Sequence, residues 1–237
     1  MNIAVIFAGG IGSRMKTKNG VLKQFLEIND VPILIHTIMN FEREKMVDAI
    51  IVVMKDGFIE YTNELIKKYG IKKVAKVVCG GETGQESIYN GLVAADAIST
   101  SEDDIVLIHD GVRPFIGSDL IIKNIKSVRE CGSAISCVPA TETLVITDGD
   151  ANITHIPLRA NSMIAKAPQS FYLKDILAAH KKILALGIHD SIDSCTLIYR
   201  YKKDLAVVMT DYDNIKVTTP KDLYLAESIY KKRQNMI

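Results

Sequence analysis

The stretch IAVIFAGG, residues 3–10, decides the fold, because a short and continuously apolar run ends there in two glycines. Such a run is typical of a parallel β-strand that helices cover on both faces. Comparable apolar runs recur at residues 49–54, 74–78, 105–109 and 134–138. Stretches with helical periodicity lie between them, at residues 32–44, 58–69, 86–97 and 118–131. The alternation predicts an α/β fold with a doubly wound, mostly parallel sheet and helices on both faces.

The alternation of strand and helix is interrupted after Pro139. Residues 143–147 and 153–156 have the pattern of two short strands, which the turn Asp-Gly-Asp-Ala at 148–151 joins. We therefore expect a projecting β-hairpin arm at about residues 140–158. Projecting hairpins cover an active site or embrace another subunit, and a decorative excursion without a partner is the alternative. We expect a homodimer formed through this arm.

Beyond the arm, the sequence returns to helices and one further strand. Helical patterns cover residues 173–186, 191–199 and 220–233, and residues 205–209 have the pattern of a strand. No linker, internal repeat or low-complexity segment divides the chain, so we expect a single domain over residues 1–237 that carries the arm. In sheets of this kind, ligands bind at the carboxyl ends of the strands. The glycines after the first strand and the segment HDGVRP at 109–114 both occupy such positions.

The composition excludes several classes of protein. Lysine and arginine number 29 against 28 acidic residues, so no global charge attracts nucleic acid or an anionic membrane. The four cysteines form no CxxC pair and no zinc-type spacing, which favours reduced thiols in a reducing compartment. The N-terminus has no basic region before its apolar run, and that run is too short to span a bilayer. We expect a cytoplasmic protein without a signal peptide or anchor.

The glycine stretch indicates a phosphate ligand. Three glycines let a ligand approach the main chain, and two cations follow them: Gly9, Gly10, Gly12, Arg14 and Lys23. The alternative is an ordinary strand-to-helix turn with solvated charges. A Walker A loop is absent, and Met15 stands where the dinucleotide fingerprint needs its third glycine, which argues against a hydride-transfer enzyme. The pattern GGxGSRM followed by a lysine suits a triphosphate.

Five motifs, taken in order, resemble the cytidylyltransferases that join CTP to a polyol phosphate. They are AGGIGSRM (8–15), KQFLEINDVPILIHTI (23–38), HDGVRPF (109–115), APQSF (167–171) and DNIKVTTPKDL (213–223). The family includes ribitol-5-phosphate enzymes, which supply CDP-ribitol for teichoic acid or capsule polymers, and methylerythritol-phosphate enzymes of isoprenoid synthesis. The double glycine and the segment from IPLR to APQSF look more like the ribitol branch, whereas Asp213 speaks slightly for the other. The resemblance implies a Rossmann-like nucleotidyltransferase fold that uses CTP and, by preference, D-ribitol 5-phosphate.

The resemblance also implies roles for individual residues. Negative charge accumulates on phosphate oxygens during such a transfer, so the protein must supply positioning and fixed positive charge. The catalytic cations would be Arg14, Lys23 and Lys216. The nucleotide would be bound by Ala8, Gly9, Gly10, Gly12, Gly81, Ser87 and Asp110. A Mg²⁺ ion would be held by Asp110 and Asp213, and the polyol phosphate would be bound by Thr141, Arg159 and Asp193.

Three positions depart from the family pattern. Leu22 stands where a proline is usual, Gly84 stands where an arginine is frequent, and Ala167 replaces a threonine that many relatives direct toward the polyol. A nucleotide-binding module without turnover is the alternative that Gly84 and Ala167 suggest. The retention of Asp110 together with the expected lysines and arginines argues against that alternative.

Overall fold

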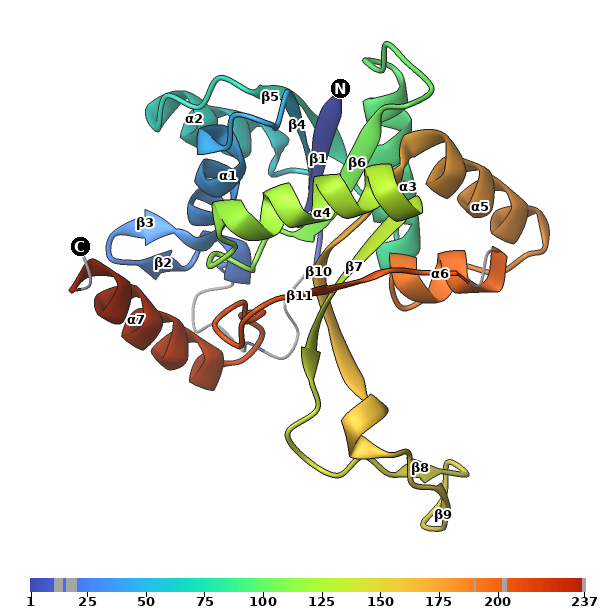
Figure 1. Cartoon of the computed structure of the whole chain (residues 1–237). Coiled ribbons are helices and arrows are strands. Elements are labelled where there is room, and N and C mark those ends of the chain that lie inside the picture. The colour runs from blue at the N-terminus through green and yellow to red at the C-terminus, as the bar shows by residue number, and fades with distance from the viewer. Residues whose placement is uncertain (11–14, 16–20, 190, 202–203, 236–237) are drawn as a thin grey trace.

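A seven-stranded β-sheet forms the centre of the molecule, with its strands in the order β11-β7-β10-β6-β1-β4-β5 (Figure 1). The computed structural model describes residues 1–10, 15, 21–189, 191–201 and 204–235. The strands are β1 (Asn2–Phe7), β4 (Ala49–Met54), β5 (Val74–Cys79), β6 (Ile105–Asp110), β7 (Ser133–Pro139), β10 (Met163–Tyr172) and β11 (Val207–Met209). In this sheet β10 runs antiparallel to both of its neighbours, and the other strands are parallel. The predicted mostly parallel sheet is confirmed.

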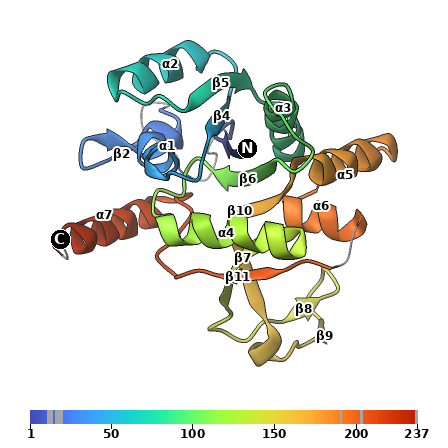
Figure 2. The ribbon, with the colours of Figure 1, turned by 45° about the horizontal axis from the view of Figure 1, so that its top comes forward.

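Helices cover both faces of the sheet (Figure 2). On one face lie α1 (Ile33–Arg43), α2 (Ile59–Lys68) and α4 (Ser118–Cys131), and on the other lie α3 (Gly84–Asp96), α5 (Leu173–Ala185) and α6 (Ser194–Tyr201). Along β1, Ala4 and Ile6 pack against the first group, whereas Ile3 and Val5 pack against the second. Burial on both faces is the reason that the strand is apolar at every position.

Helix α3 lies unusually close to the sheet. A Cβ atom on Gly91 would lie 2.5 Å from Val5 Cγ1 and 2.6 Å from Val53 Cγ2, so no larger residue fits without movement of the helix. This contact sets the position of α3 on β1 and β4. The N-terminus of α3 therefore lies near the carboxyl ends of those strands.

A third and smaller core lies under the last helix, α7 (Pro220–Gln234). Its buried side chains include Ile28, Val217 and Ile229. Ile28 belongs to a small hairpin of β2 (Glu27–Ile28) and β3 (Val31–Pro32), which the sequence analysis did not predict. Two-residue strands leave no periodic pattern that a sequence reading could detect.

The sequence analysis also missed β10, which lies between β6 and β7. Its first half is largely exposed, and its second half is buried. Lys166 and Pro168 interrupt the apolar pattern, and a proline inside a run argues against a central strand. The sequence MIAKAPQSFY therefore lacks the continuous apolar run that identified the other strands.

The expected arm is present between β7 and β10 and projects from one end of the sheet (Figure 1). It contains β8 (Ile146–Thr147), β9 (Ile153–His155) and the short helix η2 (Arg159–Asn161). The first strand of the arm is shorter than predicted, and the predicted helix at 191–199 begins at Ser194.

All four cysteines are free. Among the described residues, no helix has the length and apolar character needed to cross a membrane.

Candidate active site

A first cavity of about 440 Å³ opens where the carboxyl ends of β1 and β6 meet the loops after β4 and β5. The strand order reverses at this point, since the chain adds β4 and β5 on one side of β1 and β6 on the other. Ligands of open α/β sheets bind at such positions. The cavity brings together many residues predicted from the sequence: Ala8, Gly9, Gly10, Lys23, Gly81, Ser87, Asp110 and Lys216.

The loop before α3 forms one wall of the first cavity. Thr83 caps the helix by accepting a hydrogen bond from Glu86 N at 3.1 Å, and Glu86 Oε2 accepts one from Glu82 N at 2.8 Å. Ser87 Oγ accepts a hydrogen bond from Gly81 N at 3.1 Å. A Cβ atom on Gly81 would lie 2.3 Å from Glu86 Cβ, so the loop needs glycine there. The capping fixes a backbone wall that a ligand can approach closely.

The short helix η1 (Lys23–Phe25) is attached to the end of β1 by a buried side chain. Gln24 Nε2 donates a hydrogen bond to the Ala8 carbonyl at 2.6 Å. This bond helps to position the neighbouring Lys23, which lines the first cavity. Gln24 and the exposed Lys55, which follows β4, also line the cavity, and the sequence analysis singled out neither.

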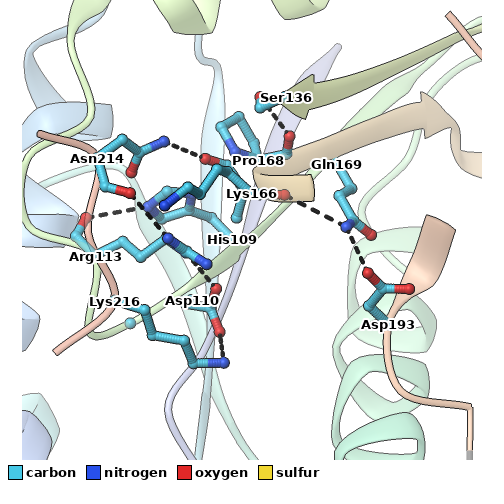
Figure 3. A network of polar contacts seen from close by, with 12 residues as sticks. His109, Asp110, Arg113, Ser136, Lys166, Pro168, Gln169, Asp193, Asn214 and Lys216 are labelled. Carbon is cyan, nitrogen blue, oxygen red and sulfur yellow. Dashed lines mark hydrogen bonds and ion pairs between the residues drawn. The ribbon is translucent and has the colours of Figure 1, made fainter. Parts of the chain in front are cut away.

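Asp110, at the end of β6, holds two cations in place (Figure 3). Its Oδ2 accepts a hydrogen bond from Arg113 Nε at 2.7 Å, and its Oδ1 lies 2.5 Å from Lys216 Nζ. Arg113 Nη1 also donates to the Asn214 carbonyl at 2.9 Å, which ties the loop after β6 to the segment that carries Lys216. The Lys216 ammonium lies 6.0 Å from the centre of the Phe7 ring.

Charge and burial act against each other at Asp110. Burial raises the pKa of this carboxyl, but the charges of Lys216 and Arg113 outweigh burial and hold the pKa well below its ordinary value. The neighbouring His109 is fully buried, and burial lowers its pKa to about 4. At neutral pH Asp110 is therefore a carboxylate, and the imidazole of His109 beside it is uncharged.

A second cavity, of about 190 Å³, adjoins the first and shares Phe7, Asp110 and Lys216 with it. The rest of its wall comes from distant segments: Arg113, the β10 residues 165–167 and Gln169, and residues 192–194. Asp193, which the sequence analysis expects to bind the polyol phosphate, lines this second cavity. One of its oxygens accepts from Gln169 Nε2 at 3.0 Å, and the other accepts from Thr196 N at 2.8 Å at the start of α6.

The remaining predicted site residues lie elsewhere or outside the described part of the chain. Thr141 and Arg159 are exposed on the arm, and neither belongs to the described residues that line the two cavities. Asp213 also lies apart from those residues, with its carboxylate 3.9 Å from Lys232 Nζ. Gly12 and Arg14 lie outside the described residues. The roles assigned to these five residues stay predictions.

In the second cavity, three further side chains were not identified from the sequence: Arg113, Lys166 and Gln169. A signal existed for Arg113, because HDGVRP places it three residues after Asp110. Lys166 and Gln169 belong to β10. Because this strand was not predicted, the faces of the sheet to which its side chains point could not be predicted either. Their place in the second cavity could come only from the fold.

The described residues contain no cluster of three side chains that would bind a metal without a ligand. Mg²⁺ does not need such a cluster, because it binds one or two carboxylates together with substrate phosphates. Asp110 is the predicted ligand that lines both cavities, but its two oxygens already contact Arg113 and Lys216. It is a single carboxylate, and the phosphates of a nucleotide would have to supply further oxygens.

Comparison with known proteins agrees with this arrangement. Residues 2–232 match the profile of the family described as 2-C-methyl-D-erythritol 4-phosphate cytidylyltransferase. The chain is 49% identical to a ribitol-5-phosphate cytidylyltransferase of Streptococcus agalactiae serotype III, over 99% of this chain and 98% of the relative. It is 39% identical to a 2-C-methyl-D-erythritol 4-phosphate cytidylyltransferase of Geotalea uraniireducens, over 96% of each. A solved 4-diphosphocytidyl-2C-methyl-D-erythritol synthase from Anaerococcus prevotii has a TM-score of 0.82 at 27% identity, and covers 97% of this chain and 96% of its own.

Proposed function

The chain belongs to the 2-C-methyl-D-erythritol 4-phosphate cytidylyltransferase family, and from this premise we propose that it transfers the cytidylyl group of CTP to D-ribitol 5-phosphate. The products are CDP-ribitol and pyrophosphate. The choice of ribitol rests on the higher identity to a ribitol-5-phosphate enzyme, 49% against 39% for the methylerythritol relative. 2-C-methyl-D-erythritol 4-phosphate is the second candidate acceptor, because the family profile carries that description.

The observation that carries the proposal is the position of Lys216 between two adjoining cavities. In this proposal CTP occupies the first cavity, the polyol phosphate occupies the second, and the α-phosphorus lies at their boundary. An oxygen of the acceptor phosphate attacks the α-phosphorus, the bond from this phosphorus to the bridging oxygen breaks, and pyrophosphate leaves. Lys216 stands where negative charge increases during the step, and fixed charges of this kind stabilise such transition states.

Asp110 acts as an anchor in this mechanism rather than as a base. Its low pKa keeps it ionised, and its two oxygens orient Arg113 and Lys216. A general base is not required, because a phosphate monoester with a second pKa of about 6 is already largely deprotonated at pH 7. Catalysis therefore depends on position and on charge.

The other predicted residues complete the nucleotide site. Lys23 and the backbone of Ala8, Gly9 and Gly10 would contact the triphosphate, with Gly12 and Arg14 from the same loop. Gly81 and Ser87 would lie against the nucleoside. Mg²⁺ would neutralise charge on the phosphate oxygens when bound, held mainly by those phosphates, with Asp110 and Asp213 as its predicted protein ligands.

We also propose that the arm joins two copies of the chain. Large apolar side chains are exposed along it: Val145, Ile146, Ile153, Ile156 and Leu158. Leu158 is 74% exposed, and a second arm of the same kind would cover such residues. Thr141 and Arg159 adjoin this surface, so in the dimer they would reach the acceptor site of the other subunit. Sedimentation of the wild type and of Leu158→Glu tests this, and a wild-type monomer would contradict it.

Release of pyrophosphate tests the activity directly. CTP and Mg²⁺ are mixed with ribitol 5-phosphate, 2-C-methyl-D-erythritol 4-phosphate or glycerol 3-phosphate, and UTP replaces CTP in a control. We expect rapid release with CTP and ribitol 5-phosphate. A higher kcat/KM with 2-C-methyl-D-erythritol 4-phosphate would identify that compound as the acceptor. If no pyrophosphate were released with any of the three compounds, only the nucleotide-binding module would remain.

We propose that the reaction takes place in the cytoplasm, with no nucleic-acid or membrane partner.

A further inference from the structure

Lys166 is directed into the second cavity by an irregularity in β10. Ala165 pairs with Cys137 of β7, and Gln169 pairs with Ile135, so three residues of β10 stand opposite one residue of β7. Extra residues in one strand bend it and change the direction of its side chains, and they are frequent beside active sites. Pairing of β10 with β6 begins only at Gln169, so Lys166 lies beyond the carboxyl end of β6.

Side chains of neighbouring segments replace the backbone pairing that is lost here. Asn214 Nδ2 donates to the Ala167 carbonyl at 2.7 Å, and Ser136 Oγ donates to the Pro168 carbonyl at 2.7 Å. Asn214 and Ser136 are themselves buried. The irregular segment is therefore held by defined partners, and Figure 3 shows the Lys166 side chain pointing toward Arg113.

The ammonium group of Lys166 has no carboxylate beside it. No side chain in the described ranges forms an ion pair or a hydrogen bond with this group. Burial and the like charge of Arg113 both lower the pKa of Lys166. Asp193 lines the same cavity, but its oxygens accept from Gln169 and from the backbone of Thr196. Lys166 is half-buried, and its charge faces that of Arg113 without a compensating carboxylate, so an anionic ligand in the second cavity would supply the missing partner.

We propose that Lys166 binds the phosphate of the acceptor and is a specificity-determining residue for it. This inference rests on the proposed function and deepens it. The acceptor phosphate would lie between Lys166, which lines only the second cavity, and Lys216, which lines both. Ala167 lines the second cavity without a hydrogen-bonding side chain, so the polar recognition from this part of β10 depends on Lys166.

The test compares Lys166→Met with Lys166→Arg, since methionine keeps much of the length and removes the charge. For Lys166→Met we expect KM for ribitol 5-phosphate to rise about ten- to a hundredfold, as for loss of a charged hydrogen bond, and KM for CTP to change less than about twofold. Lys166→Arg should retain most of the acceptor affinity. Lys174→Met, on the exposed Lys174–Glu102 pair, removes the same charge far from the site and should change neither constant.

The outcomes separate this inference from the proposed function. An unchanged KM for the acceptor in Lys166→Met, or a rise confined to CTP, overturns the role of Lys166 while the activity stands. If another polyol phosphate proves to be the substrate, the same comparison is made with that compound. If none of the polyol phosphates reacts, the proposed function fails. Calorimetric titration of inorganic phosphate into wild type and Lys166→Met then still tests whether Lys166 binds phosphate. Equal phosphate affinity in the two proteins overturns the inference.

Discussion

The two cavities of the site are built in different ways. The first contains glycines and small residues in loops that directly follow strands, such as Gly9 after β1 and Gly81 after β5, together with lysines such as Lys23. The second is formed by side chains from segments far apart in the sequence, among them Arg113, Lys166 and Asp193. A short local motif can specify the first kind of wall, whereas the second exists only after the sheet has assembled. Many residues of the first cavity could therefore be predicted from the sequence, whereas Asp193 is the one residue confined to the second cavity that was predicted as a site residue.

We expect the largest effect from substitution of Asp110, which lines both cavities and contacts Arg113 and Lys216. Asp110→Asn removes the partner of Arg113 and Lys216 and leaves a buried cation unpaired. We expect the free energy of unfolding to fall by about 3–5 kcal/mol, as for a broken buried ion pair, and turnover to be lost. Denaturant titration measures the loss. Asp103→Asn, an exposed aspartate in a loop, is the control and should stay within about 0.5 kcal/mol.

The stabilisation that Asp110 contributes should depend on pH in a defined direction. The folded-state pKa of Asp110 lies below its ordinary value of about 3.9, so the carboxylate stabilises the fold above that pH. The stabilisation is lost as the pH falls through the folded-state pKa. The difference in unfolding free energy between wild type and Asp110→Asn should thus be constant from about pH 8 to 5 and narrow below about pH 4. A difference that widened on acidification would contradict the role of the carboxylate as a charged anchor.

Lys216→Ala should separate catalysis from stability. Its side chain is 38% exposed, and Asp110 keeps Arg113 as a partner, so we expect only a small change in Tm. Turnover should fall by about a hundred- to a thousandfold, the usual effect of removing one transition-state donor. Lys232→Ala, whose lysine is 66% exposed, is the matched control. A large loss of Tm with turnover preserved would show that Lys216 is structural. The proposed reaction centre at the boundary of the two cavities would then be wrong.

Asp193→Ala tests the second cavity alone. The change removes the acceptor of Gln169 Nε2 and the cap of α6 at Thr196 N. Loss of a cap costs about 0.5–2 kcal/mol, so Tm should fall moderately. KM for the acceptor should rise while KM for CTP stays constant, and Asp193→Asn should restore Tm because asparagine also caps helices. An effect on CTP of equal size would mean that the cavities are not energetically distinct.

The limits of the sequence analysis follow the same division. The strands were predicted wherever both faces are buried, as in β1 and β4, because such strands are apolar at every position. β10 was missed because half of it is exposed and Lys166 and Pro168 interrupt its pattern. The surroundings of Lys166 include Arg113 and Lys216, which lie about 50 residues away along the chain in either direction. No local pattern contains that information.

The smallest predicted effect concerns the first cavity. Ser87→Ala removes the hydroxyl that accepts from Gly81 N, which loosens the backbone wall beside the nucleotide. An ordinary hydrogen bond contributes about 0.5–1.5 kcal/mol, so KM for CTP should rise about two- to tenfold while KM for the acceptor stays constant. Ser127→Ala is the matched control, because its hydroxyl donates to the Ser133 carbonyl at 2.9 Å away from both cavities. If Ser87→Ala instead raised KM for the acceptor, the loop before α3 would contribute to the binding of both substrates. The proposed assignment of one substrate to each cavity would then be wrong.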